Sequence, residues 1–337
     1  MHGGLLTART PRTAGPVIRG AADLSVATLS RALGTPVQGF EMLTEASNWS
    51  HQIRLQVDLA DGSRRALRLK CCLGDTFGPS EVRYYTQDYL DLADAPLVPC
   101  HDAAYEKNVG YHLLLEDLAG THHDRRDAPP GLAYGLALAQ ALARLHRHHW
   151  GSQPAPGTAT LDRYVAEIRP GVKVLEAMTG LAMQPRFDAH ETALRARWSS
   201  PRGMSLLHGD LNPTNVLTPV SAEVPVYFLD RQPFDWSLQY GVAVYDLAYA
   251  TAPWWPEDDW REHQGAVLRH WHQSLGQVDY SWEDALADWR LSVEQCLHVP
   301  MEWCAKPESA TRMRWLWEAQ LARVRAALTT LSTAGNA

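Results

Sequence analysis

The feature that most constrains this chain is the spacing of three oxygen-bearing side chains in its second half. Asp210 is followed five residues later by Asn215, and Asp230 closes the short apolar run 226–229. Mg²⁺ takes oxygen ligands, and an attacking hydroxyl needs a carboxylate that orients it and accepts its proton. The spacing therefore indicates metal-dependent phosphoryl transfer, with Asp210 as the catalytic carboxylate and Asn215 and Asp230 as metal ligands. Asp and Asn also favour turns, so a chance cluster of turn residues is the alternative.

A lysine and a glutamate upstream are spaced as a pair. Residues 53–59 alternate between apolar and polar, which is typical of a half-buried strand. Asp61 and Gly62 then turn the chain into a second strand that ends at Lys70. Glu81 opens a helical segment eleven residues after Lys70. A lysine that follows a strand is usually just solvated, but the glutamate behind it makes an ion pair the competing interpretation.

Residues 208–215 read His-Gly-Asp-Leu-Asn-Pro-Thr-Asn. This run and the later Asp230 resemble the catalytic loop and the metal-binding aspartate of the aminoglycoside phosphotransferase and choline kinase-like families, which are relatives of the protein kinases. Lys70 and Glu81 stand in the order of the family's strand lysine and helix glutamate. The resemblance spans about residues 37–250. It implies an α+β, two-lobed protein kinase-like fold, with a small antiparallel β N-lobe that carries one helix and a large, mainly α-helical C-lobe.

The resemblance and the turn residues together suggest how the chain is divided. We predict a flexible arm over residues 1–20, a nucleotide-binding N-lobe over 21–118, and a catalytic and acceptor-binding helical C-lobe over 119–337. Within the C-lobe, residues 161–198 read as helices that are broken around Pro170 and Pro185. Proline has no backbone N–H and therefore disfavours a helix interior.

The resemblance also implies where the phosphates of a nucleotide bind. Lys70 would contact the phosphates, and Glu81 would hold Lys70 in place. The turn between the first two strands would cover the phosphates and contains Ser47, Asn48 and Ser50. This turn has no glycine, so hydroxyl and amide side chains would supply the donors. An ordinary polar hairpin turn is the alternative.

The adenine pocket is expected to involve the apolar strand and connector over residues 110–118. By resemblance, Leu115 lines this pocket, and backbone groups of Glu116 and Leu118 contact the adenine edge. We expect the side chains of Glu116 and Asp117 to be solvated. Arg68 departs from the family pattern, because its position is more often small or aromatic. Its guanidinium can stack on the base or, in another strand register, be exposed.

Two residues are expected to support the catalytic loop. By resemblance, Asp246 ties the backbone of that loop together; a simple carboxylate at a helix N-terminus is the alternative. His208 is expected to support the loop rather than to carry protons. The acceptor is expected among the C-terminal helices and loops, where the aromatic and acidic loop 254–260 supplies the candidates Trp255, Glu257, Asp258 and Asp259. Charges at the rim of a site are also commonly just solvated.

Composition limits the partners. A net charge of −7 argues against a nucleic-acid-binding protein, which would need a basic face. Five cysteines without a Cys-x-x-Cys pair favour reduced thiols in a cytoplasmic protein over a disulfide framework or a zinc site. No apolar run is long enough for a membrane span, and the first twenty residues lack the apolar core of a signal peptide. The oligomeric state stays open.

These observations predict an ATP- and Mg²⁺-dependent O-phosphotransferase, with GTP as another possible donor. The γ-phosphate would pass to a hydroxyl of an aminoglycoside-like or other antibiotic, a sugar or an amino alcohol, with antibiotic resistance as one role. The alternative is a nucleotide-binding pseudokinase that regulates a partner. A kinase that acts on proteins is disfavoured, because Arg231 and Gln232 replace the Phe-Gly pair after Asp230 and no Ala-Pro-Glu segment follows. The sequence does not choose among the acceptors.

Overall fold

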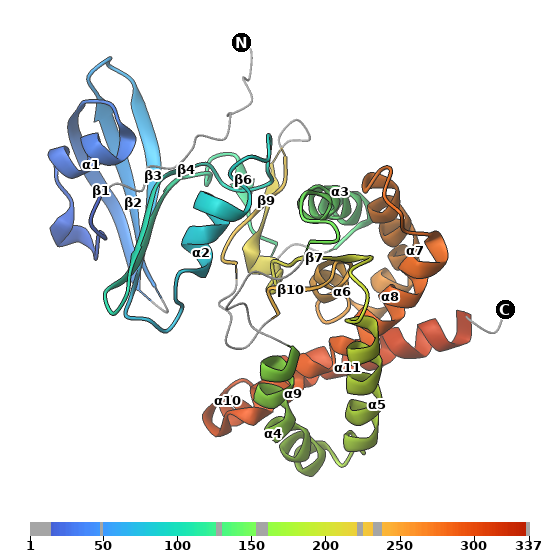
Figure 1. Cartoon of the computed structure of the whole chain (residues 1–337). Coiled ribbons are helices and arrows are strands. Elements are labelled where there is room, and N and C mark those ends of the chain that lie inside the picture. The colour runs from blue at the N-terminus through green and yellow to red at the C-terminus, as the bar shows by residue number, and fades with distance from the viewer. Residues whose placement is uncertain are drawn as a thin grey trace. The chain divides into compact units, whose positions relative to one another are not determined.

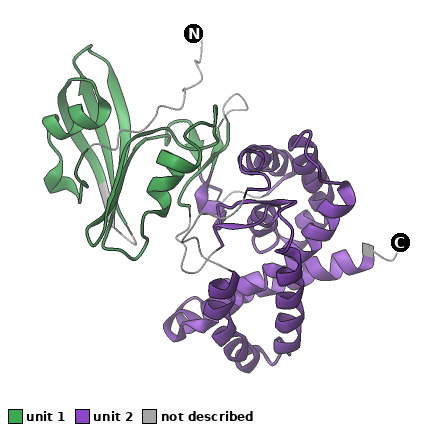
Figure 2. Cartoon of the chain, viewed as in Figure 1, with its two compact units in different colours: residues 1–123, 217–233 green, residues 124–216, 234–337 purple. Residues whose placement is uncertain are grey.

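The computed structural model describes residues 15–47, 50–125, 130–152, 161–220, 225–231 and 238–334. The chain divides into two compact units (Figure 2): residues 1–123 with 217–233, and residues 124–216 with 234–337. The first unit therefore extends past the predicted lobe boundary at residue 118. It also takes up the later segment that carries Asp230.

The first unit is built on a five-stranded antiparallel sheet with the strand order β1-β2-β3-β5-β4 (Figure 1). Its strands are β1 (Val37–Ser47), β2 (His51–Leu59), β3 (Arg64–Leu73), β4 (Cys100–Glu106) and β5 (Gly110–Glu116). The predicted hairpin between β2 and β3 is present, and Gly62 in its turn has a φ of 84°, which only glycine adopts readily.

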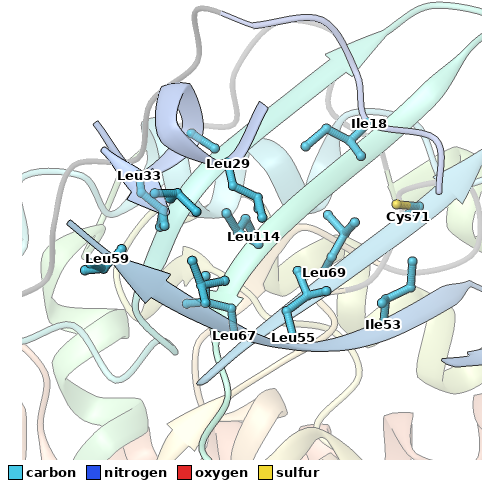
Figure 3. Packing of buried hydrophobic residues seen from close by; sticks show 13 residues of the cluster. Ile18, Leu29, Leu33, Ile53, Leu55, Leu59, Leu67, Leu69, Cys71 and Leu114 are labelled. Carbon is cyan, nitrogen blue, oxygen red and sulfur yellow. The ribbon is translucent and has the colours of Figure 1, made fainter. Parts of the chain in front are cut away.

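The core of the first unit lies between one face of this sheet and helix α1 (Val26–Leu33). Alternate side chains of β2 and β3, such as Leu55 and Leu69, are fully buried against Leu29 of α1 (Figure 3). Each buried leucine stabilises the unit by roughly 1.5–3 kcal/mol. Ile18 joins the same cluster, and its N–H donates to Nδ1 of His112 at 3.0 Å. The last residues of the predicted arm thus pack on the sheet, whereas residues 1–14 lie outside the described chain.

Two short segments bring polar residues to the first unit's sheet. Helix α2 (Ser80–Arg83) continues into a π-helical turn at Tyr84–Asp88 and packs against β4 and β5. A three-stranded sheet has the order β6-β8-β9 and comprises β6 (His122–His123), β8 (Val216–Pro219) and β9 (Tyr227–Phe228). Phe228 pairs with Leu97, so Asp230 lies two residues after the end of a strand that is tied to the unit.

The second unit is helical. Its longer helices are α3 (Leu132–His148), α4 (Leu161–Thr179), α5 (Gln184–Arg197), α7 (Glu257–Ser274), α8 (Trp282–Gln295) and α11 (Arg314–Ala334), and its shorter ones are α6 (Tyr245–Thr251), α9 (His298–Ala305) and α10 (Pro307–Arg312). A two-stranded sheet of β7 (Met204–Leu206) and β10 (Tyr240–Val242) lies beside them. No helix in the described part of the chain is long and apolar enough to cross a membrane.

The predicted helix break at Pro170 is wrong. Helix α4 continues through Pro170, because the proline removes only one backbone hydrogen bond and α4 packs against α9. The next residue, Gly171, makes that packing possible, since a Cβ atom there would lie 1.7 Å from the carbonyl oxygen of Met301. Pro185 instead lies in the first turn of α5, where proline is favourable, so the break before it is present.

Candidate active site

The ammonium of Lys70 on β3 binds two carboxylates in the first unit. Strand alternation places Leu69 and Cys71 in the core and turns Lys70 to the opposite face. Its Nζ atom donates to Oε2 of Glu81 at 2.6 Å and to Oδ1 of Asp230 at 2.8 Å. The structure thus brings together three of the residues that the sequence singled out.

The charge of this buried lysine is set by its partners. Burial by itself would lower the pKa of Lys70, but the carboxylates of Asp230 and Glu81 outweigh it, so the pKa is raised and the ammonium stays charged. Tyr111 of β5 donates its hydroxyl to the same Glu81 oxygen at 2.5 Å. The glutamate is therefore held in place from two sides, and Lys70 with it.

Asp230 has a backbone conformation that few residues adopt. Its φ of 55° lies in the left-handed region, which aspartate tolerates better than most side chains. The carboxylate is nearly half exposed, so a metal ion in solvent can reach it. Strained backbone of this kind is concentrated at functional sites.

Arg231, directly after Asp230, is a buried residue whose contacts the sequence reasoning did not predict. Its side chain is buried, donates to Asp88 and lies over the ring of Tyr84, with 5.3 Å from the guanidinium carbon to the ring centroid. These contacts tie the chain directly after Asp230 to the π-helical turn that follows α2. The available signal was a charged residue where protein kinases place the phenylalanine of Asp-Phe-Gly.

The predicted adenine residues lie along β3 and β5. Arg68 lies 3.9 Å from the Asp117 carboxylate, which Arg54 also binds at 2.6 Å. The expectation of a solvated Asp117 is wrong, because this carboxylate is buried between the two arginines. Leu115 is buried, and the N–H of Glu116 donates to the carbonyl of Pro99.

The backbone hydrogen bonds decide which atoms could meet a base. The N–H of Glu116 donates to the carbonyl of Pro99 at 2.9 Å, so this group is engaged within the unit. The carbonyl of Leu118 accepts from the N–H groups of Thr121 and His122. Contact of Glu116 and Leu118 with adenine stays a prediction.

The predicted phosphate-covering turn is only partly described. The backbone of Ser47 ends β1 and pairs with His51, whereas its side chain and the whole of Asn48 lie outside the described residues. The hydroxyl of Ser50 accepts a hydrogen bond from the Gln52 amide at 2.9 Å. A role for this turn in phosphate binding stays a prediction.

In the second unit, the carboxylate of Asp210 has hydrogen-bond donors on both oxygens. Its Oδ1 atom accepts from the hydroxyl of Tyr249 at 2.7 Å, and its Oδ2 atom accepts from the amides of Asn212 and Asn215, each at 3.1 Å. The Asn215 amide also donates to the Asp210 carbonyl at 2.8 Å. With its nitrogen so engaged, Asn215 has its carbonyl oxygen as the atom to offer a hard cation.

The local fold of this loop follows from its residue types. Asn212 accepts from the N–H of Thr214 at 2.8 Å and so caps the 3₁₀ turn at Pro213–Asn215. Pro213 stands at the first position of the turn, where it is well tolerated. The cap and the proline together bring Asn215 back to Asp210.

Asp246 of α6 holds the backbone of the loop, as the resemblance implied. Its carboxylate is buried and accepts from the N–H of His208 at 2.7 Å and from that of Gly209 at 2.9 Å. His146 adds a contact of 3.2 Å through Nε2, while its Nδ1 accepts from the indole of Trp271. Burial would raise the pKa of Asp246, but His146 and the backbone donors outweigh it, so the pKa is lowered.

His208 supports the loop from within. Its Nδ1 atom accepts from the N–H of Asp210 at 3.3 Å. His146 was missed as a supporting residue, because the sequence shows it only as one of several histidines near the end of a helix.

The predicted acceptor residues mostly form the start of α7. Trp255 is buried against the ring of Tyr134, with 6.1 Å between the centroids. The first turn of α7 contains Glu257, Asp258 and Asp259, and acidic side chains interact favourably with the helix dipole at this end. Asp258 also forms an ion pair with Arg261. A role of these four residues in acceptor binding stays a prediction.

A different carboxylate lies within electrostatic reach of Asp210. The pKa of Glu302 on α9 is raised to about 8. Loss of solvent contact raises it most, Lys306 lowers it in part, and the charges of Asp210 and Glu167 raise it. The nearest distance from Glu302 to the Lys306 ammonium is 3.9 Å. The signal in the sequence was a single charged residue within the apolar run Met301-Glu302-Trp303.

Solved structures show the same fold. A protein from Thermobifida fusca assigned as a fructosamine-3-kinase matches with a TM-score of 0.54 and 18% identity, over 90% of this chain and 98% of that one. An ethanolamine kinase from Plasmodium vivax matches with a TM-score of 0.50 and 13% identity, over 88% and 83% of the two chains. The two-lobed protein kinase-like fold predicted from the sequence is therefore confirmed.

The family follows from the sequence match. Residues 80–286, more than half of the chain, match the model of the phosphotransferase enzyme family, APH, and the chain belongs to this family. It is a small-molecule phosphotransferase, as the resemblance implied. No curated protein sequence matches the chain significantly.

Proposed function

We propose that this phosphotransferase uses ATP and Mg²⁺ to phosphorylate a hydroxyl of a small molecule that carries an amino group. The observation that carries the proposal is the Lys70 ammonium, which is buried and bonded to both Glu81 and Asp230. A buried ammonium beside a half-exposed carboxylate suits a nucleotide phosphate with its metal ion. GTP is a second donor to be tested.

The roles of the protein groups follow from their geometry. Lys70 would hold the phosphates, with Glu81 and Tyr111 fixing its position. Asp210 would orient the acceptor hydroxyl and take its proton while the new O–P bond forms and the bond to ADP breaks. Positioning and charge carry such a reaction, because the protein makes no covalent bond to the phosphoryl group.

The donor set also fits a magnesium ion. Asn215 and Asp230 would hold Mg²⁺, which neutralises charge on the phosphates when it is bound. Among the described residues, no group of three or more His, Cys, Asp or Glu side chains is arranged to hold a metal. Mg²⁺ commonly binds through one or two protein ligands together with substrate phosphates and water, so a sparse donor set is suitable.

Glu302 supports an acceptor with an amino group. Glu302 is a partly buried carboxyl group near Asp210, and it gains a partner when a cation binds, so its ionisation then costs less. Aminoglycoside-like antibiotics, amino sugars and amino alcohols combine such a cation with a hydroxyl. The two similar proteins are named as kinases of fructosamine and ethanolamine, which belong to the same chemical class.

The test is phosphorylation of a panel of acceptors. The full chain with Mg²⁺ and ATP, or GTP, is incubated with kanamycin, ethanolamine, a fructosamine and amine-free sugars, and the phosphate adducts are detected by mass spectrometry. We expect an adduct of one amine-bearing acceptor, which the Asp210→Asn variant does not form at a comparable rate. Nucleotide binding with Mg²⁺ but without any phosphorylated acceptor would favour a pseudokinase instead. Drug susceptibility of bacteria that express the chain tests the resistance role.

A further inference from the structure

The hydroxyl of Tyr249 bonds the carboxylate of Asp210, a contact that no sequence pattern indicated. Tyr249 lies on α6, is 8% exposed and donates to Oδ1 of Asp210 at 2.7 Å. The other oxygen, Oδ2, accepts from Asn212 and Asn215. Asp210 is therefore held through both oxygens, by donors from two different elements.

The two sets of donors do not have the same effect. The terminal torsion of an aspartate is broad and roughly two-fold, so donors on one oxygen alone leave the carboxylate plane poorly defined. Asn212 and Asn215 lie in the same loop as Asp210, two and five residues after it. Tyr249 comes from a separate helix, and every residue of that helix is buried.

Helix α6 also holds the loop at a second point. Asp246, three residues before Tyr249, binds the N–H groups of His208 and Gly209. One fully buried helix thus bonds both the backbone of this loop and the side chain of its aspartate. Burial and the nearby Asp210 charge raise the pKa of Tyr249 well above its ordinary value, so the phenol stays protonated and remains a donor.

We propose that Tyr249 is a positioning residue for phosphoryl transfer, because it fixes the plane of the Asp210 carboxylate that meets the acceptor hydroxyl. The inference rests on the proposed function. In the reaction, the acceptor oxygen bonds to the γ-phosphorus, the bond to the leaving ADP oxygen breaks, and the hydroxyl proton passes to Asp210. Tyr249 makes and breaks no covalent bond and acts only through Asp210.

The first test is the Tyr249→Phe variant, which removes the hydroxyl and keeps the ring, whose centroid lies 6.1 Å from that of Trp254. Radiolabelled ATP with Mg²⁺ is the probe, with the acceptor that the panel identifies and with water alone. We expect kcat to fall about 10- to 100-fold while both KM values change less than about two-fold. Tyr245→Phe is the matched control, because it removes another buried hydroxyl of α6 and should keep kcat.

The second test is a double-mutant cycle with Asp210→Asn under single-turnover conditions. If Tyr249 acts only through Asp210, the double variant should be no slower than Asp210→Asn alone. Multiplicative losses would assign Tyr249 a general structural role and overturn the inference. An unchanged kcat of Tyr249→Phe would also overturn the inference. A loss of kcat that accompanies a lower Tm, or a Tyr249→Phe protein that does not fold, would do the same.

These results separate the inference from the function on which it rests. A wild-type protein that transfers phosphate neither to an acceptor nor to water contradicts the proposed function, and the role of Tyr249 falls with it. A wild-type protein that is active, together with an equally active Tyr249→Phe variant, contradicts only the inference about Tyr249.

Discussion

Lys70 and Asp230 are 160 positions apart in the sequence, yet the ammonium of Lys70 donates to Oδ1 of Asp230 at 2.8 Å. Both residues belong to the first unit, because segment 217–233 returns to that unit after the chain has begun the second. The lysine that we propose to bind phosphate and the proposed metal ligand therefore belong to one compact unit. Their spacing does not depend on the second unit.

The Lys70→Met variant should lose activity and stability together. Removal of the ammonium takes a positive charge from the phosphates, so we expect kcat to fall about 100- to 1000-fold. It also leaves Glu81 buried without its cation, which lowers Tm. Steady-state kinetics and thermal unfolding measure both effects. Lys107→Met, at an exposed turn position of the same unit, is the control; equal behaviour of the two variants would contradict the role of Lys70.

The Asp246→Ala variant should loosen the catalytic loop. The backbone N–H groups of His208 and Gly209 lose their acceptor. Each buried N–H that is left without a hydrogen-bond partner lowers the stability by about 1–3 kcal/mol. We expect a lower free energy of unfolding in denaturant titrations and a lower kcat. Asp162→Ala removes an aspartate with an exposed side chain in the same unit and should change neither quantity. Wild-type stability of Asp246→Ala would show that Asp246 does not hold the loop.

Glu302 should make stability depend on pH. Its pKa is 4.5 in the unfolded chain and about 8 in the folded protein, so between these values only the folded state keeps the proton. The stability that this residue contributes is therefore present below about pH 4.5 and is lost as pH rises through about 8. Relative to wild type, Glu302→Gln should gain Tm as pH rises from about 5 to about 9. A constant Tm difference over this range would contradict the raised pKa.

Gly171 and Gly265 should respond to alanine in opposite ways. A Cβ atom at Gly171 would overlap the Met301 carbonyl, so we expect Gly171→Ala to destabilise the protein by about 1–3 kcal/mol or more. Gly265 lies within α7 with no atom near its Cβ position, and alanine there should stabilise the helix by about 0.5–1 kcal/mol. Denaturant unfolding of both variants checks the pair. A neutral Gly171→Ala would mean that α4 and α9 can separate at little cost.

The sequence by itself indicated those site residues that can be identified from their spacing along the chain. Asp210 with Asn215 in one loop, and Lys70 with Glu81 on a strand and the following helix, could be identified because short-range order places them. Strand alternation and turn residues indicated the sheet for the same reason. The two-lobed fold was predicted from the resemblance of residues 208–215, Asp230, Lys70 and Glu81 to a known family.

The tertiary structure decided which distant side chains meet the predicted ones. Tyr249 on Asp210, Arg231 on Asp88, and the placement of Glu302 all depend on contacts between elements far apart in the chain. No local periodicity encodes such contacts, because they arise only when buried faces pack. For the same reason, local composition could not separate an acidic binding loop from the acidic first turn of α7, and it suggested a helix break at Pro170 that packing against α9 overrides.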